Sequence, residues 1–246
     1  MIILMKCLNE ERNIKRCLGN FHDEPFIHKV IVIDGGSTDY TVQELLQWKK
    51  VQVFIHPWLD WYHDAEVSQS NIALSYIPHG ELAFIMDFDE KMSPELKKVL
   101  EAINTGHGAF TIPLGGAVNF SRRTFDLIRY EDSPHALVGE DGWPMISHQI
   151  GQYPDFQCRL IRRSKELHWV NSPHHVLLGA TFTANIEADI LHYEKDDFRD
   201  RERLERKWAR AQARRIELGL IADIFETQAK PEVGSYYHPE GWKKQD

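Results

Sequence analysis

The chain has 246 residues, including 37 acidic residues and 29 lysines and arginines, and its formal net charge is −8. This length suffices for one large domain, and the acidic balance argues against a general nucleic-acid-binding protein. The longest apolar stretches are only as long as strands, so we expect no transmembrane helix. The three cysteines lack metal-binding or CxxC spacing, and no long hydrophobic signal region follows the N-terminus. We therefore expect a cytoplasmic protein with reduced cysteines.

Strand and helix signals alternate through the first 105 residues. Apolar runs predict strands at residues 2–5, 29–33, 51–55 and 82–86. Amphipathic or capped segments predict helices from about residue 10, from residue 38 or 39, over 65–77 and from residue 94. Such alternation predicts an α/β fold with a mostly parallel sheet flanked by helices.

The spacing of apolar residues also predicts which helix face is buried. The expected inward residues are Ile14, Cys17, Leu18 and Phe21 in the first helix, Val42, Leu45 and Leu46 in the second, Val67, Ile72, Ala73 and Tyr76 in the third, and Leu96, Val99, Leu100 and Ile103 in the fourth. Ser93 and Pro94 form a good start for the fourth helix, and Gly106 lies just beyond its expected end.

The pattern changes after Gly106. Residues 107–192 carry short β-like runs and loops with clustered histidine, tryptophan and proline, which indicates an extension built onto the sheet. A further helix is expected over about 198–218. We expect 1–105 and 106–230 to be two halves of one domain, and 231–246 to be a tail.

The fourth predicted strand ends in two aspartates, Asp87 and Asp89. Residues at i and i+2 of a strand point to the same side, and open α/β sheets bind ligands at the carboxyl ends of their strands. Paired carboxylates suit Mg²⁺ or Mn²⁺ bound together with a diphosphate. The alternative interpretation is an acidic turn before a helix.

Three polar motifs follow predicted strands in order: Cys7–Ile14, Val32–Asp39 and Asp87–Glu90. Together they resemble the glycosyltransferase family 2 domain with the GT-A fold, over roughly residues 1–105. The later segments 157–163, 169–175 and 191–193 resemble, more loosely, the branch of lipopolysaccharide-core sugar transferases.

The resemblance implies a Rossmann-like GT-A sheet with an extension and a helix on the acceptor side. It implies a metal-dependent, inverting transfer of a sugar from a nucleotide-sugar donor to an acceptor hydroxyl on a saccharide or a lipid-linked saccharide. Residues 1–105 would then bind the nucleotide-sugar, and residues 106–230 would hold the acceptor.

The resemblance also assigns residues to the donor site. The implied nucleotide-binding residues are Leu8, Asn9, Glu10, Asp34, Gly36, Gln69, Asn71 and Asp87. The implied ligands of Mn²⁺ or Mg²⁺ are Asp87, Asp89 and His174, with Asp89 preferred as a direct ligand. A UDP-sugar is the favoured donor. The identity of the nucleotide base stays undecided, because Gly35 stands where many family members have a second acid that often binds uracil. Helix capping and turn formation are the alternative roles of Asn9 and Asp34.

The acceptor hydroxyl needs a general base within hydrogen-bond reach. Asp155, Asp141 and His175 are the candidates, together with Glu140, and we favour Asp155. In the similar branch a glutamate usually stands where this chain has His175. The alternative for each of these residues is a charged group on a surface loop.

Other functions stay open. The segment Arg199–Arg215 has eight Lys/Arg and three Asp/Glu. With Arg122 and Arg123 it suggests a glycosyltransferase that acts on modified DNA bases, and it would also permit peripheral membrane contact. A non-catalytic nucleotide-sugar-binding module is a further alternative. A nucleotidyltransferase would need a basic glycine-rich loop where Asn9 and Glu10 stand.

Overall fold

The computed structural model describes residues 1–58, 65–107, 111–129, 132, 135–170 and 175–194. In the first part strands and helices alternate in the order β1 (Ile2–Cys7), α1 (Glu11–Phe21), β2 (Lys29–Asp34), α2 (Thr41–Leu45), β3 (Val51–Ile55), α3 (Ala65–Ser75), β4 (Leu82–Met86), β5 (Glu90–Met92) and α4 (Pro94–Thr105). Only strands follow among the later described residues: β6 (Gly116–Leu127), β7 (Ile146–Arg162), β8 (His168–Val170), β9 (Val176–Leu178) and β10 (Phe182–Tyr193).

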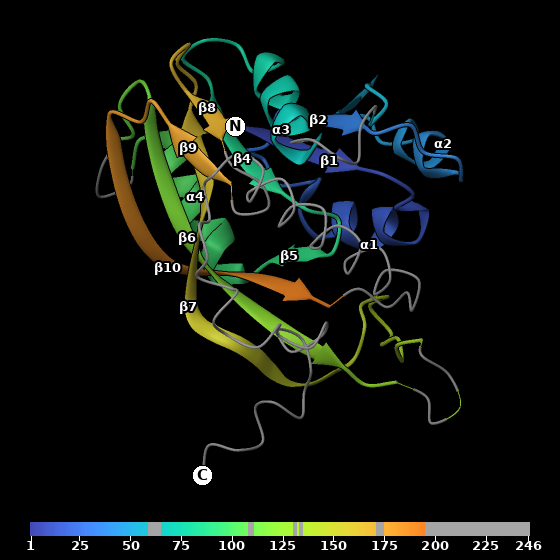
Figure 1. The fold of residues 1–246 in the computed structure, drawn as a ribbon. Helices are drawn as coiled ribbons and strands as arrows, with labels where there is room; N and C mark the ends of the chain where they lie inside the picture. The colour runs from blue at the N-terminus through green and yellow to red at the C-terminus, as the bar shows by residue number, and fades with distance from the viewer. Residues whose placement is uncertain (59–64, 108–110, 130–131, 133–134, 171–174, 195–246) are drawn as a thin grey trace, which may run out of the picture.

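Eight of these strands form one mixed sheet in the order β3-β2-β1-β4-β7-β6-β10-β5 (Figure 1). The first four run parallel, with Cys7 beside Asp34 and Met5 beside Met86. β7 is antiparallel to both β4 and β6, and it joins the two parts of the chain in one sheet. β8 and β9 form a separate two-stranded ribbon. The prediction of an α/β fold with a mostly parallel sheet is confirmed for these residues.

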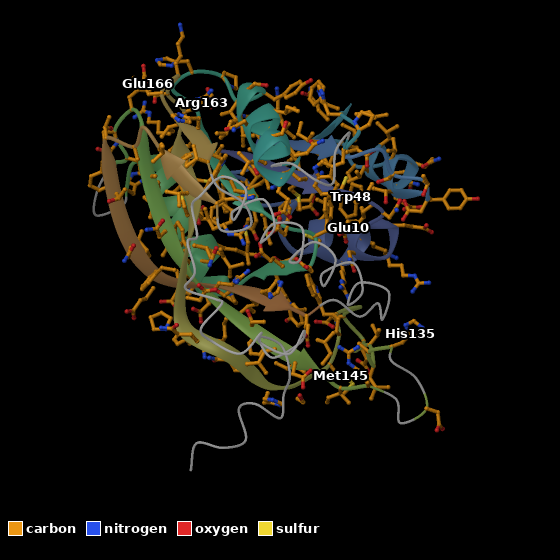
Figure 2. The ribbon with its side chains drawn as sticks, in the orientation of Figure 1. Glu10, Trp48, His135, Met145, Arg163 and Glu166 are labelled. Carbon is orange, nitrogen blue, oxygen red and sulfur yellow. The ribbon has the colours of Figure 1, made fainter. Side chains whose placement is uncertain are left out.

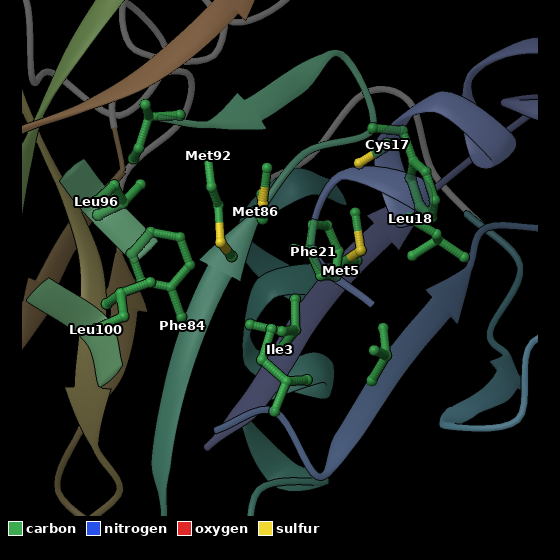
Figure 3. Packing of buried hydrophobic residues seen from close by; sticks show 14 of the residues in the cluster. Ile3, Met5, Cys17, Leu18, Phe21, Phe84, Met86, Met92, Leu96 and Leu100 are labelled. Atoms are coloured by element: carbon green, nitrogen blue, oxygen red, sulfur yellow. The ribbon is translucent and has the colours of Figure 1, made fainter. Parts of the chain in front are cut away.

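Helices cover both faces of the parallel part of the sheet. α1 and α4 pack on one face, where Phe84 and Met86 of β4 meet Leu18, Phe21, Leu96 and Leu100 (Figure 3). On the other face, Val67, Ala73 and Leu74 of α3 and Trp169 of β8 pack against β1, β2 and β4. Burial of this apolar surface on two faces explains why β1, β2 and β4 have nearly continuous apolar sequences.

Most of the inward residues expected for the four helices are buried. In α1 they are Ile14, Cys17, Leu18 and Phe21, as predicted. In α4 the Ser93 hydroxyl accepts a hydrogen bond from the Leu96 N–H at 3.1 Å, and Gly106 ends the helix at a φ of 74°. The prediction for Leu46 was wrong, because α2 ends at Leu45 and the Leu46 side chain is 66% exposed.

The expectation of short β runs after Gly106 holds for β8 and β9, which have three residues each, but was wrong for the other three strands. β6, β7 and β10 have 12, 17 and 12 residues, and they extend the main sheet. Figure 2 shows the span of β7, since Met145, just before it, and Arg163, just after it, lie at opposite ends of the molecule. The residues of β7 before Asp155 are mostly exposed, and register shifts interrupt its pairing with β6. The strand therefore lacks the regular apolar alternation by which strands are predicted.

Several predictions concern residues outside the described part of the chain. They are His174, the helix over about 198–218 with its basic segment, and the tail 231–246. The DNA and membrane alternatives therefore stay predictions, as do the domain limits. Within the described residues, no helix is long and apolar enough to cross a membrane.

Candidate functional site

The three predicted motifs meet at the carboxyl edge of the parallel strands. β1 lies between β2 and β4, so the segments after Cys7, Asp34 and Met86 leave the sheet side by side. Figure 2 shows Glu10, the residue before α1, at this edge. Open α/β sheets bind their ligands at such an edge, which makes it the candidate site.

Asp34 shapes the turn after β2. Its Oδ1 accepts hydrogen bonds from the N–H groups of Gly36 and Ser37, and its Oδ2 accepts one from the Ser37 hydroxyl at 2.5 Å. The Cys7 thiol also lies 3.4 Å from Oδ2, and the residue is buried. These contacts match the turn role that the sequence left open for Asp34. A donor base could reach its carboxylate only if the turn rearranged.

Asn9 and Glu10 join the end of β1 to the turn after β2. Asn9 has a φ of 58°, and its side-chain oxygen accepts a hydrogen bond from the Thr38 N–H at 2.8 Å. Glu10 is buried and accepts a hydrogen bond from Asn13 at 2.6 Å. The half-buried Leu8 precedes them. This loop is thereby held against the β2 turn, where the sequence predicted a nucleotide border.

A tryptophan covers the glycine turn. The backbone N–H of Trp58 donates a hydrogen bond to the Gly35 carbonyl at 3.0 Å. A Cβ on Gly35 would lie 3.0 Å from the Trp58 ring and 3.2 Å from the Cys7 carbonyl oxygen. Gly36 has a φ of 91° and lies against Pro57. A side chain at position 35 would therefore have to displace the Trp58 ring or the Cys7 carbonyl slightly, so close packing favours glycine where an acid is often found.

Gln69 and Asn71 lie on α3 but contact different segments. Gln69 is buried and donates to the His56 carbonyl at 2.5 Å, while its Oε1 accepts no hydrogen bond from the described residues. Asn71 accepts from the Trp169 N–H at 2.7 Å and donates to the Trp169 carbonyl at 2.9 Å. Gln69 Oε1 is itself buried, so a ligand could reach it only after a local rearrangement, whereas Asn71 ties α3 to β8.

Asp87 is held by two residues that the sequence did not single out together. The guanidinium of Arg159 contacts both acids. Its Nη1 lies 3.3 Å from Asp87 Oδ2, and its Nη2 lies 2.5 Å from Glu90 Oε1. The other Glu90 oxygen accepts the Asp87 backbone N–H at 3.0 Å. Arg159 and Glu90 are buried, whereas the Asp87 side chain is 45% exposed. Asp87 therefore presents part of its carboxylate to solvent.

The buried guanidinium of Arg159 is thus a single cation that contacts two carboxylates, those of Asp87 and Glu90. Burial would raise the pKa of Asp87, but the Arg159 guanidinium outweighs burial and holds this pKa below its ordinary value. Burial dominates at Glu90 and raises the pKa of its carboxyl to about 7. Asp87 is therefore ionised at neutral pH, as a ligand of a divalent cation must be.

Asp89 lies deeper than Asp87. Its side chain is 7% exposed, and its Oδ2 lies 3.6 Å from His192 Nε2, while Thr124 contacts the other ring nitrogen at 3.2 Å. Among the described residues, no group of three or more His, Cys, Asp or Glu is arranged to hold a metal ion. Two carboxylates fit a Mg²⁺ or Mn²⁺ ion that takes its other ligands from phosphate and water. Of the two, Asp87 is the more accessible, in contrast to the preference for Asp89.

Two of the candidate bases are engaged elsewhere. Asp155 Oδ2 accepts two hydrogen bonds from Arg122, at 3.0 and 2.8 Å, and its Oδ1 accepts one from Gln157 at 2.8 Å. Asp141 accepts the Trp143 N–H at 3.0 Å and lies 3.4 Å from Lys91. The Trp143 N–H is the larger cause that lowers the Asp141 pKa, and Lys91 adds to it. A lowered pKa makes a weaker base.

The third candidate, His175, is paired with a glutamate of α3. Its Nε2 lies 3.5 Å from Glu66 Oε2. One turn along the same helix, Ser70 accepts a hydrogen bond from Lys6 at 2.8 Å. The positive charge of Lys6 is also among those that lower the pKa of Asp87. His175 and Lys6 therefore contact side chains of α3 that lie one helical turn apart.

Sequence reasoning missed the partners Glu66, Glu90 and His192. For Arg159 it left two roles open, contact with a diphosphate or an anionic acceptor, and a buried ion-pair partner, and the structure shows buried contacts with Asp87 and Glu90. Glu90 follows the Asp-x-Asp motif directly, which was a usable signal. Arg159 and His192 lie in the segments 157–163 and 191–193 that resemble the family, but their partners could not be predicted, because β7 and β10 are distant in sequence from Asp87 and Asp89. Arg122 and Arg123, which suggested a nucleic-acid acceptor, form ion pairs with Asp155 and Asp189.

The chain was compared with known proteins. The sequence model of the family described as "Glycosyl transferase family 2" matches residues 2–163. A search of curated proteins gave no match. Among solved structures, a mannosyltransferase from Pyrobaculum calidifontis, in complex with GDP-Man and Mn²⁺, is 15% identical with a TM-score of 0.50. The match covers 88% of this chain and 64% of that one, and this likeness supports the fold alone.

Two further solved structures are similar over shorter stretches. S. aureus TarS 1–349 in complex with UDP is 17% identical with a TM-score of 0.38, and the match covers 56% of this chain and 41% of that one. Glucosyl-3-phosphoglycerate synthase from Mycobacterium tuberculosis is 17% identical with a TM-score of 0.35, and the match covers 50% and 43%. The chain thus spans less than half the length of either.

Proposed function

The chain belongs to glycosyl transferase family 2, and we propose that it transfers a sugar from a nucleotide-sugar donor to an acceptor hydroxyl with inversion. The observation that carries the proposal is the position of Asp87. Its ionised, partly exposed carboxylate lies at the carboxyl edge of β4, beside the loops that follow β1 and β2. The edge of the sheet formed by β1, β2 and β4 would take the donor.

Asp87 and Asp89 are the proposed ligands of Mg²⁺ or Mn²⁺, with His174 as a third candidate. Bound there, the ion would supply electrostatic stabilisation of the departing diphosphate. Lys6 and Arg159 add positive charge next to Asp87. A UDP-sugar stays the favoured donor. GDP-sugars belong in the same test, because the archaeal mannosyltransferase that shares this fold was solved with GDP-Man and Mn²⁺.

The contacts shift the proposed general base from Asp155 to His175. Asp155 would have to release Arg122 or Gln157 before it accepted a proton, and Asp141 is a weakened base. His175 has a carboxylate partner in Glu66, which can stabilise the imidazolium that forms when the ring takes the acceptor proton. Glu66 would then do the work of the glutamate that this chain lacks beside His174.

The acceptor is proposed to be a saccharide or a lipid-linked saccharide, as in the lipopolysaccharide-core branch. The support is the likeness of the later segments, of which Gln157–Arg163 lies in β7 and at its end, and Leu191–Tyr193 lies at the end of β10. Both strands reach the edge that carries Asp87 and Asp89, through Arg159 and His192. An acceptor held by β7 and β10 would therefore lie next to the donor.

The donor assignment is tested with a thermal-shift panel of UDP-, GDP-, CDP-, ADP- and dTDP-sugars, each with and without Mn²⁺. One nucleotide class should raise the melting temperature only with metal, since a ligand of the native state stabilises it. The Asp89→Ala variant should stay folded, but its melting temperature should no longer rise with donor and metal, and it should not catalyse the metal-dependent transfer. Wild-type turnover of Asp89→Ala would refute the metal assignment. No shift with any donor would favour a module with a degenerate donor site, or a site that forms only when the acceptor is present.

The assignment of the general base is tested by measuring the rates of donor hydrolysis and of sugar transfer in two variants. We expect His175→Asn to lower kcat by about 10²–10⁴-fold with donor binding intact, because general-base catalysis contributes about that much. Asp155→Asn, the matched control, should reduce kcat far less. The reverse order of the two effects would return the role to Asp155.

A further inference from the structure

Arg159 reaches Asp87 and Glu90 from an irregular position of β7. In the pairing of β6 with β7, Val118 lies opposite Leu160, and the next residue, Asn119, lies opposite Cys158. Arg159 is therefore the extra residue of a β-bulge. Bulges bend a strand and redirect one side chain, and they are frequent next to active sites.

The redirected side chain is buried between two acids of another strand–turn unit. Arg159 and Glu90 are 69 residues apart in sequence, and their side chains are 8% and 0% exposed. An unpaired charge at such a depth would cost several kcal/mol, so both groups depend on the pairing. The planar guanidinium contacts the two carboxylates through separate nitrogens, a geometry that the single amine of lysine does not reproduce.

Both the backbone and the side chain of Asp87 are held by this pair. Glu90 accepts the Asp87 N–H, and Arg159 contacts Asp87 Oδ2. The Cys17 thiol also lies 3.6 Å from the Asp87 carbonyl oxygen. The carboxylate is therefore fixed on one side and presented to solvent on the other.

We propose that Arg159, supported by Glu90, is a positioning residue that orients the Asp87 carboxylate for a divalent cation. The inference rests on the proposed function, because it takes the cation site at Asp87 as its starting point. It goes beyond that function because it assigns to Arg159 neither donor nor acceptor contact. Groups that orient metal ligands typically contribute about 10–100-fold to metal affinity.

The test is a double-mutant cycle on Mn²⁺ affinity, measured by electron paramagnetic resonance of free Mn²⁺ with the unliganded protein. The four proteins are wild type, Arg159→Lys, Asp87→Asn and the double variant. Lysine keeps the positive charge, so a change in affinity reports orientation rather than electrostatic repulsion. Arg162→Lys is the matched control, since Arg162 lies on the same strand and donates to the carbonyls of Gly80 and Ile112.

We expect Arg159→Lys to raise the Mn²⁺ dissociation constant by about tenfold or more, and the double variant to bind no worse than Asp87→Asn. Arg162→Lys should bind as wild type does. Wild-type affinity in Arg159→Lys, or a loss in the double variant equal to the product of the single losses, would overturn the inference. Glu90→Gln, an isosteric change, serves if Arg159→Lys does not fold, and it should weaken Mn²⁺ binding in the same direction.

The same measurement separates the two proposals. If wild type binds no Mn²⁺ either alone or with UDP or GDP present, the proposed metal-dependent function fails and the inference fails with it. If wild type binds Mn²⁺ and transfers sugar while Arg159→Lys is unchanged, only the inference fails.

Discussion

Cys158 lies beside Arg159 in β7, and its surroundings determine its reactivity. Burial raises the pKa of its thiol to about 11, although Arg159 acts in the opposite direction. Burial also raises the pKa values of Cys7 and Cys17, which are almost completely inaccessible. All three thiols are therefore protonated at neutral pH, which makes them weak nucleophiles.

This environment predicts the pH dependence of alkylation. Only the thiolate attacks iodoacetamide, so the rate at Cys158 should rise about tenfold per pH unit from about pH 7.5 to about pH 9.5, with no plateau. Mass spectrometry of the labelled peptide gives the rate, and Cys158→Ser removes the signal. A plateau near pH 9, the ordinary pKa of a cysteine thiol, would show that burial does not act as described.

Asn71 adds a polar connection between α3 and β8, whose apolar side chains also pack together. Its side-chain amide pairs with both backbone groups of Trp169, and this joins α3 to the ribbon of β8 and β9. The ring of His175, in the segment before β9, also lies near Trp169, with 6.0 Å between their ring centroids. The position of the proposed base therefore depends on a contact between a helix and a small ribbon that is not part of the main sheet.

Removing that contact should cost stability. Asn71→Ala leaves the two backbone groups of Trp169 without their partner, so we expect the free energy of unfolding to fall by about 1–3 kcal/mol. Ser75→Ala on the same helix removes an exposed hydrogen bond to the Ile72 carbonyl, and it should change stability by less than about 0.5 kcal/mol. Urea denaturation measures both. Equal effects of the two variants would contradict the role given to Asn71.

The whole molecule is organised by one sheet. β7 pairs with β4 of the first half and with β6 of the second half, and the larger apolar cluster extends from Ile3 in β1 to Ile190 in β10. Phe84 and Phe120, one from each half, contact each other with 5.6 Å between their ring centroids. The two halves therefore share a core, which favours cooperative unfolding.

We predict a single unfolding transition for these strands. Ile3→Val and Ile190→Val should each destabilise the protein by about 0.5–1.5 kcal/mol and lower the same calorimetric midpoint. Differential scanning calorimetry of the two variants checks this. Two resolved transitions, each shifted by only one of the substitutions, would mean that the halves unfold separately.

The alternating first hundred residues could be predicted closely from the chain. Observed strands β3 and β4 match the predicted residues, and the ends of α4 agree with the signals of Ser93 and Gly106. The ordered polar motifs at the strand ends led to the family, and the position of Asp87 at the sheet edge agrees with its place after β4. Such features depend on neighbouring residues, because capping and apolar periodicity act over a few positions.

The long strands after Gly106 and the contacts inside the site could not be predicted from such local features of the sequence. Arg159 and Asp87 are 72 residues apart, and they meet only because β7 pairs beside β4 and a bulge redirects the arginine. In the same way, the fold brings Glu66 to His175 and Asp89 to His192. Strand pairing and burial decide which charged groups become neighbours, and both depend on the packing of distant segments rather than on local sequence.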